Sequence, residues 1–100
     1  MAKQKQEIIN NIKAYISKNG DRYREWYVGI ASDPRQRLFN EHGVHQNGDA
    51  WICEQSESDS AAREIEKYFV ETLGTDGGAG GGDYTSIFVY AYKKSSHTKP

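Results

Sequence analysis

The chain has 100 residues, of which 36% are hydrophobic and 27% charged, and its formal net charge is −1. A chain of this size and composition forms one core and is not disordered by composition. The near-neutral charge excludes a uniformly basic nucleic-acid coat. No apolar run approaches the roughly 18 residues of a membrane span, and the first residues lack the apolar stretch of a secretory signal. We therefore expect a cytoplasmic protein with no membrane association.

The first half of the chain predicts two helices and two strands. Isoleucines at helical spacing predict an amphipathic helix over residues 6–19, and the strand-forming run over residues 25–30 predicts a buried strand. Asp33 and Pro34 then form a helix start, because aspartate caps backbone N–H groups and proline suits the first helical position. That helix should run to about His42. A polar loop and a second strand, residues 50–53, should follow.

The second half predicts one long helix and a final strand. Capping residues at 56–60 precede apolar residues at 3.6-residue spacing up to Leu73, and the glycine-rich loop 75–83 follows. Residues 86–92 predict a last strand. Together these elements predict an α+β fold, with a small antiparallel sheet of about three strands flanked by helices. Residues 1–94 should form one domain and residues 95–100 a disordered polar tail.

One acidic residue breaks the apolar pattern of the long helix. Glu66 falls about 40° around the helix axis from Ala62, inside the apolar arc, whereas Glu64 and Glu71 fall on the opposite face. A buried carboxylate is costly unless a cation or a metal pairs with it. Glu66 is therefore half of a structural ion pair, a residue at the edge of the apolar arc, or a catalytic or metal-binding carboxylate.

The order and spacing of several residues resemble the GIY-YIG nuclease superfamily. Tyr27-Val28-Gly29 is similar to the second motif of that family, Arg37 stands at the position of its essential arginine, and Glu66 matches its metal-binding glutamate. The resemblance covers roughly residues 26–70. The usual histidine position is occupied by Glu41, next to His42, and the downstream asparagine has no counterpart.

The first family motif is missing from its usual place. About ten residues before Tyr27 the sequence has Tyr15 within a helical pattern, where the family has a strand. The C-terminal strand is a better counterpart, which makes the chain resemble a circularly permuted member with that strand beside residues 26–30. Tyr90 and Tyr92 would then share a face, because side chains alternate along a strand.

The resemblance implies metal-dependent hydrolysis of a phosphodiester, by an endonuclease or nickase. It assigns Mg²⁺ or Mn²⁺ to Glu66 and a phosphate oxygen to Arg37. Tyr27, with Tyr90 or Tyr92, would order or deprotonate the attacking water, and His42 is an alternative base. His42 and His45 also have the spacing of a zinc pair, but the sequence shows no second Cys/His pair to complete it.

DNA is the expected partner, and a protein partner would supply specificity in a phage or mobile-element setting. We assign the DNA contacts to Arg22, Arg24 and Arg35, with Trp26 and Gly29. The glycine-rich loop lacks the Gly-Lys-Ser/Thr ending of a phosphate-binding loop, so no nucleotide cofactor is expected. The alternative is a catalytically weak relative that binds nucleic acid or protein.

Overall fold

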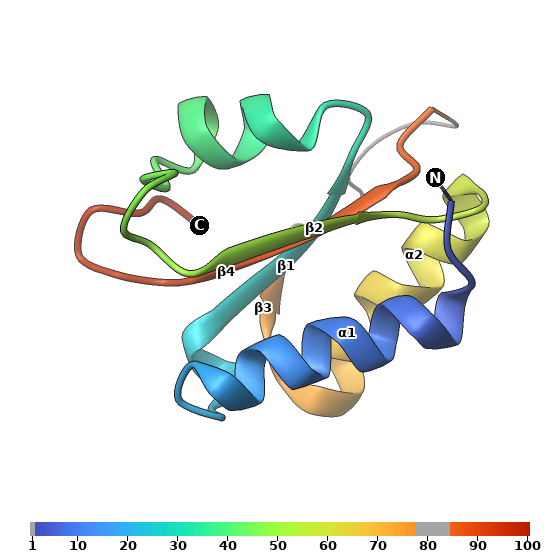
Figure 1. Cartoon of the computed structure of the whole chain (residues 1–100), viewed down its shortest axis with the longest axis horizontal. Helices are drawn as coiled ribbons and strands as arrows, with labels where there is room; N and C mark the ends of the chain where they lie inside the picture. The colour runs from blue at the N-terminus through green and yellow to red at the C-terminus, as the bar shows by residue number, and fades with distance from the viewer. Residues whose placement is uncertain (1, 78–84) are drawn as a thin grey trace.

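The computed structural model of the chain describes residues 2–77 and 85–100 (Figure 1). An N-terminal helix leads into the first strand, and the remaining helical and extended segments follow in alternation. The elements in chain order are α1 (Lys5–Lys18), η1 (Tyr23–Glu25), β1 (Trp26–Ala31), η2 (Gln36–Glu41), β2 (Trp51–Gln55), α2 (Asp59–Lys67), η3 (Tyr68–Leu73), β3 (Asp76–Gly77) and β4 (Phe88–Lys93).

The sheet has four strands in the order β2-β4-β1-β3. The C-terminal strand β4 lies between β2 and β1 and is antiparallel to both, which confirms the predicted pairing of this strand beside residues 26–30. The short strand β3 pairs in parallel with Tyr27 and Val28 of β1. The predicted antiparallel sheet of about three strands is thus correct for β2, β4 and β1, but β3 makes the whole sheet mixed.

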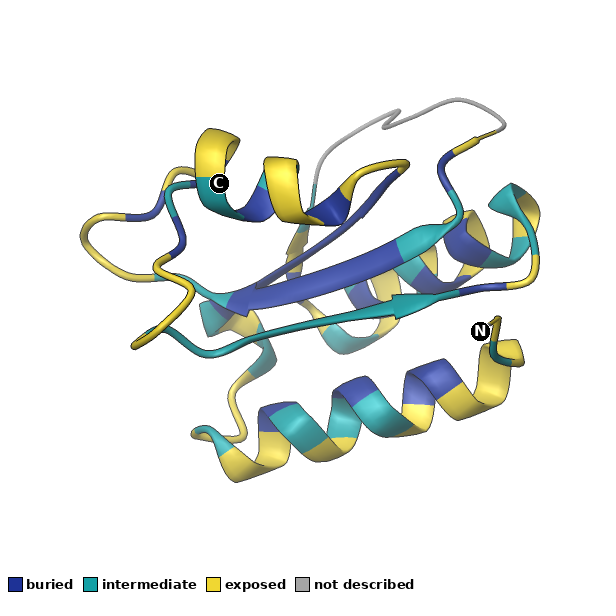
Figure 2. Cartoon of the chain, turned by 45° about the horizontal axis from the view of Figure 1, so that its top comes forward, coloured by how far each residue is buried: buried dark blue, intermediate teal, exposed yellow. Residues whose placement is uncertain are grey.

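Each face of the sheet carries its own core, because side chains alternate along the strands. On one face, Val28, Ile30 and Val89 pack with apolar residues of α1 and α2. On the other face, Tyr27, Tyr90 and Tyr92 pack beneath η2 and the segment that follows it. Figure 1 shows α1 and α2 on one side of the sheet and η2 on the other, and Figure 2 shows β1 and β4 buried between these layers.

The helix starts follow the capping signals in the sequence. The Ser58 side chain accepts a hydrogen bond from the backbone N–H of Ala61 at 3.1 Å, and the Asp33 side chain accepts one from the N–H of Gln36 at 3.2 Å. The predicted long helix changes to wider π-type hydrogen bonding at Tyr68 and stops at Gly74, whose φ of +90° favours glycine.

Residues 95–100, predicted as a disordered tail, fold back onto the domain in the structure. The Lys99 N–H donates to the His42 carbonyl at 2.7 Å, and Thr98 is buried through a local turn with Ser95. The polar composition of residues 95–100 gave no sign of this placement, because backbone groups, not side chains, join Lys99 to His42. None of the helices in residues 2–77 and 85–100 is long and apolar enough to cross a membrane.

Candidate active site

Three predicted site tyrosines lie side by side on one face of the sheet. Tyr27 of β1 is opposite Tyr92 of β4, and Tyr90 shares the face because it lies two residues from Tyr92. The Tyr27 ring stacks on Tyr92 with centroids 5.2 Å apart and on Tyr90 with centroids 6.2 Å apart. The structure therefore brings the predicted tyrosines together from opposite ends of the chain.

His42 completes this cluster, which we call the tyrosine–histidine cluster (Tyr27, His42, Tyr90 and Tyr92). Its Nε2 atom lies 2.7 Å from the Tyr90 hydroxyl. Its Nδ1 atom lies 2.7 Å from the Lys99 carbonyl and 3.2 Å from the Tyr92 hydroxyl. A carbonyl only accepts, so Nδ1–H donates to Lys99 and the neutral ring accepts the Tyr90 proton at Nε2.

Burial sets the protonation state of this cluster. Tyr90 and Tyr92 are 0% exposed and His42 is 6% exposed. Burial raises the pKa of both tyrosines well above the usual range and lowers the pKa of His42. The predicted base roles of Tyr90, Tyr92 and His42 do not match this arrangement, in which both nitrogens of the imidazole are engaged and both phenols are covered. These three residues fix the position of Tyr27 instead.

Gly29 has a packing role that differs from the predicted contact with DNA. It pairs with Tyr90 across the strands. A Cβ atom at position 29 would lie 2.5 Å from the Tyr90 hydroxyl oxygen and 2.7 Å from Cζ. The tyrosine ring thus lies directly over this glycine and covers it, because only a residue without a side chain leaves room for the ring.

Arg37 lies beside the cluster on the helical segment η2. Its Nε atom is 3.2 Å from Oε1 of Glu41, in an i,i+4 ion pair. That nitrogen is buried and makes no hydrogen bond to any residue in the described part of the chain. The guanidinium borders a cavity of about 290 Å³, also lined by Asp33, Gln36 and Glu41. Arg37 Nε is thus paired with Glu41 by charge but makes no hydrogen bond, and Arg37 borders a space large enough for a ligand group.

Glu66 of α2 is half-buried, and no hydrogen bond or ion pair to the described residues holds its carboxylate. Burial raises the pKa of Glu66 to about 7, although the charges of Arg63 and Arg37 oppose this shift. The structural ion pair that we considered for Glu66 is therefore not formed with any described residue. A half-buried carboxylate with a raised pKa is typical of functional sites.

The charges of Arg37 and Glu66 both act on Tyr27. Burial raises the pKa of the Tyr27 phenol, Arg37 lowers it, and Glu66 and Asp76 raise it. Tyr27, Arg37 and Glu66 thus form one electrostatic group, which we call the charged group.

The residues predicted to bind DNA do not form one surface. Arg22 and Arg24 precede β1 and Arg35 follows it, so a six-residue strand of roughly 20 Å separates them. Arg35 packs its guanidinium 5.7 Å from the Trp51 ring centroid. Trp26 is 0% exposed and packs edge-on against Tyr15, so it cannot stack on a base. The large apolar surface of the Trp26 indole favours its burial in the core.

Two residues that sequence reasoning missed contribute to the site. Glu41 neutralises Arg37, and the signal was present, because an acid four residues after an arginine on a helix is a common ion-pair spacing. Lys99 holds His42 through its backbone, and no side-chain pattern indicates such a contact. Most of the glycine-rich loop 75–83 lies outside the described part of the chain.

Comparison with known proteins gives no relative. The chain matches no protein-family model, no curated protein and no solved structure.

Proposed function

We propose that the chain is a metal-dependent phosphodiesterase, an endonuclease or nickase that acts on DNA. The observation that carries this proposal is the charged group: a half-buried Glu66 without a partner among the described residues, under the influence of the charge of Arg37, whose buried Nε makes an ion pair with Glu41 but no hydrogen bond. A buried carboxylate without a partner and a buried guanidinium N–H without a hydrogen bond both reduce the stability of a folded chain. That cost is offset when a ligand supplies both a cation and an anion, as a metal-bound phosphodiester does.

Glu66 fits a Mg²⁺ or Mn²⁺ ion. These ions prefer oxygen ligands and are held in many phosphate sites by one or two carboxylates, with water in the other positions. Because the pKa of Glu66 is about 7, a metal ion competes with a proton for this carboxylate near neutrality. The carboxylate is open to a divalent cation because no described residue forms an ion pair or hydrogen bond with it. When bound, the metal would supply Lewis-acid stabilisation of the charge on the phosphodiester.

The other two members would position the substrate and the water. Arg37 would bind a non-bridging phosphate oxygen, and to do so it would exchange its ion pair with Glu41 for the phosphate. Tyr27 would order the attacking water through its hydroxyl group, because burial raises the pKa of its phenol and makes it a poor base. Tyr90, Tyr92 and His42 would hold Tyr27 in place from below.

A second candidate is a catalytically weak module that binds DNA. It is favoured by the coverage of His42, whose Nδ1 atom is occupied by the Lys99 carbonyl, and by the full burial of Tyr90 and Tyr92. In either case the separated arginines provide a small contact area, and a protein partner would supply target specificity.

The two candidates are separated by a nicking assay on supercoiled plasmid with Mg²⁺ or Mn²⁺. We expect the wild type to nick the plasmid, and Arg37→Ala and Glu66→Gln to lose at least about 100-fold in rate, as loss of one charge-stabilising group does. Glu71→Gln, an exposed acid on η3, is the matched control. Circular dichroism verifies that each variant is folded.

Glu41→Gln provides a test of opposite sign. This substitution leaves Arg37 without its competing carboxylate, so we expect DNA affinity to rise by about two- to fivefold, the size of an exposed ion pair. Equal nicking by all variants would indicate a contaminating nuclease and would contradict the proposal that the chain is an endonuclease. If no protein nicks but the wild type shifts DNA in a salt-dependent way, the binding module is correct.

A further inference from the structure

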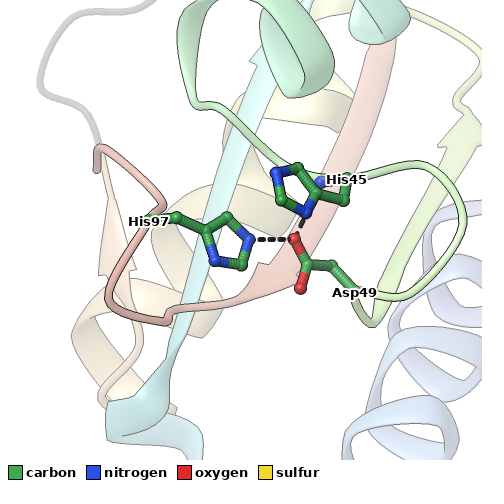
Figure 3. A group of neighbouring side chains, drawn as sticks. All are labelled: His45, Asp49 and His97. Carbon is green, nitrogen blue, oxygen red and sulfur yellow. Dashed lines mark hydrogen bonds and ion pairs between the residues drawn. The ribbon is translucent and has the colours of Figure 1, made fainter.

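Two histidines and one aspartate meet on the surface, away from the charged group. His45 and Asp49 lie in the loop between η2 and β2, and His97 lies in the C-terminal segment. One ligand atom from each lies within 4.8 Å of the other two, and Figure 3 shows the three side chains gathered together. Residues 2–77 and 85–100 contain no other group of three or more His, Cys, Asp or Glu side chains arranged in this way.

The group is already organised without a metal. The Asp49 carboxylate accepts the backbone N–H of His45 at 2.7 Å and lies 2.5 Å from Nε2 of His97. The His45 and His97 rings stack with centroids 4.0 Å apart and an angle of 13° between them. The Ser95 hydroxyl lies 3.1 Å from Nδ1 of His97. These contacts bring the C-terminal segment and the loop together at one point.

The ligand types select the metal. Imidazole nitrogen and carboxylate oxygen together suit zinc and neighbouring divalent transition metals, whereas Mg²⁺ favours oxygen alone. Three protein ligands leave a fourth zinc position for water. The Ser95 hydroxyl can accept Nδ1–H of His97 and so present Nε2 as the ligand atom, a common arrangement behind metal-bound histidines. In the sequence, His45 has the spacing of a zinc pair with His42, without a second pair to complete it; in the structure His97, not His42, lies beside His45.

Metal binding needs only small movements of exposed side chains. When Nε2 of His97 carries a proton, it donates to Asp49, and a cation would take the place of that proton and release it to solvent. Zinc bond lengths in a tetrahedron set ligand atoms about 3.3 Å apart. The Asp49 oxygen and Nε2 of His97, now 2.5 Å apart, would move slightly apart, and His45 would adjust within the present limit of 4.8 Å. The His45 ring would tilt out of its stack on His97. His45 is exposed and the His97 side chain is 37% exposed, so neither movement disturbs the core.

We propose that His45, Asp49 and His97 form a binding site for a divalent transition-metal ion of the zinc class. The bound ion ties the C-terminal segment to the loop that precedes β2. It thereby holds Lys99, two residues beyond His97, at its contacts with the backbone and ring of His42. None of its three ligands belongs to the charged group, so the metal site does not depend on the proposed function.

Histidine NMR signals provide an internal test, because the chain contains three histidines and only two belong to the site. Zinc is titrated into the full chain in a Cys53→Ser background, which removes the single thiol as a ligand. We expect the ring signals of His45 and His97 to move together and to saturate at one zinc per chain, and the His42 signals to move much less. Unchanged His45 and His97 signals at millimolar zinc would overturn the proposal.

Affinity measurements with a chromophoric zinc chelator assign the ligands. We expect His97→Ala and Asp49→Asn each to weaken zinc binding at least about tenfold, because each removes one ligand from the set of three. Asp49→Asn retains an oxygen that accepts the His45 N–H, and the His97 side chain lies outside the core, so both variants should fold. Glu57→Gln, an exposed acid elsewhere, is the matched control. Equal zinc affinity in all four proteins would show that the ion binds elsewhere and would refute the site.

Discussion

The two faces of the sheet use the same strands but different chemistry. The face toward α1 and α2 is lined by aliphatic side chains of β1 and β4, with Trp26 as its one indole. The face toward η2 is lined by three tyrosines around His42: the Tyr90 and Tyr92 hydroxyls lie at hydrogen-bond distance from its imidazole, and the Tyr27 ring packs against it. The first face stabilises the fold by removing apolar area from water, which has no preferred direction. The second face fixes atoms in place through directional hydrogen bonds.

This difference explains where a site can form. An aliphatic face tolerates small shifts, whereas a buried polar network is stable only when every donor and acceptor is satisfied. No buried polar side-chain atom of the tyrosine–histidine cluster lacks a hydrogen-bond partner, whereas in the neighbouring charged group Arg37 Nε does, and Glu66 has no partner among the described residues. A rigid, satisfied network beside an unsatisfied pair of charges is the arrangement expected of a binding site and its support.

The largest expected effect comes from the aliphatic face. Phe69 is 0% exposed and packs in the core beneath α2. Phe69→Ala should lower the free energy of unfolding by about 3–5 kcal/mol, the usual cost of removing a buried aromatic ring. Urea denaturation followed by circular dichroism measures this change. Phe39→Ala, in which a half-buried ring beside Trp51 is removed, should cost clearly less, and equal costs would contradict the division of roles between the faces.

A smaller effect is expected where β1 and β4 meet on the tyrosine face. Gly29→Ala places a methyl group against the Tyr90 ring, whose hydroxyl is held by His42. We expect a loss of about 1–3 kcal/mol in the free energy of unfolding, the usual cost of overpacking. Gly77→Ala is the comparison, because its new methyl group meets the half-buried Val70 at the sheet edge. If Gly77→Ala is the more costly of the two, Tyr90 is not locked in place.

The smallest effect is a pH-dependent gain in stability at the charged group. The pKa of Glu66 is raised from 4.5 to about 7 by burial. Between these values the folded chain binds more protons than the unfolded chain, so wild-type stability falls as pH rises across this window. Glu66→Gln removes that dependence and should be more stable than the wild type by about 1–2 kcal/mol above pH 7, with little difference near pH 4.

Urea denaturation of wild type and variant from pH 4 to pH 8, in the presence of a chelator, measures this prediction. Glu71→Gln is the matched control on the solvated side of the same helical region. A Glu66→Gln variant that is less stable than the wild type at pH 8 would mean that a cation of the protein already pairs with Glu66. The charged group would then be structural, and the proposed function would lose its main support.

Local pattern was enough to predict most of the elements and the odd position of Glu66. Helical spacing located α1 and the α2–η3 helix, and Ser58 and Asp33 cap helical segments as their residue types suggested. The period of the apolar arc also showed that Glu66 intrudes on it. Each of these features depends on residues only a few positions apart. The regular geometry of helices and strands fixes which of those residues share a face, so the features can be predicted from the sequence.

Only the tertiary structure decided what the remaining site residues do. Trp26 and Gly29 have chemistry suited to DNA contacts, yet packing against Tyr15 and Tyr90 buries them. His42 and the C-terminal segment are joined through the Lys99 backbone, which no side-chain pattern predicts. The sequence from Tyr27 to Arg37 was enough to predict a strand and a capped helix, and it carries two of the motifs on which the family resemblance is based. The partners of these residues come from residues 41–99, and long-range contacts of this kind depend on how the whole chain packs.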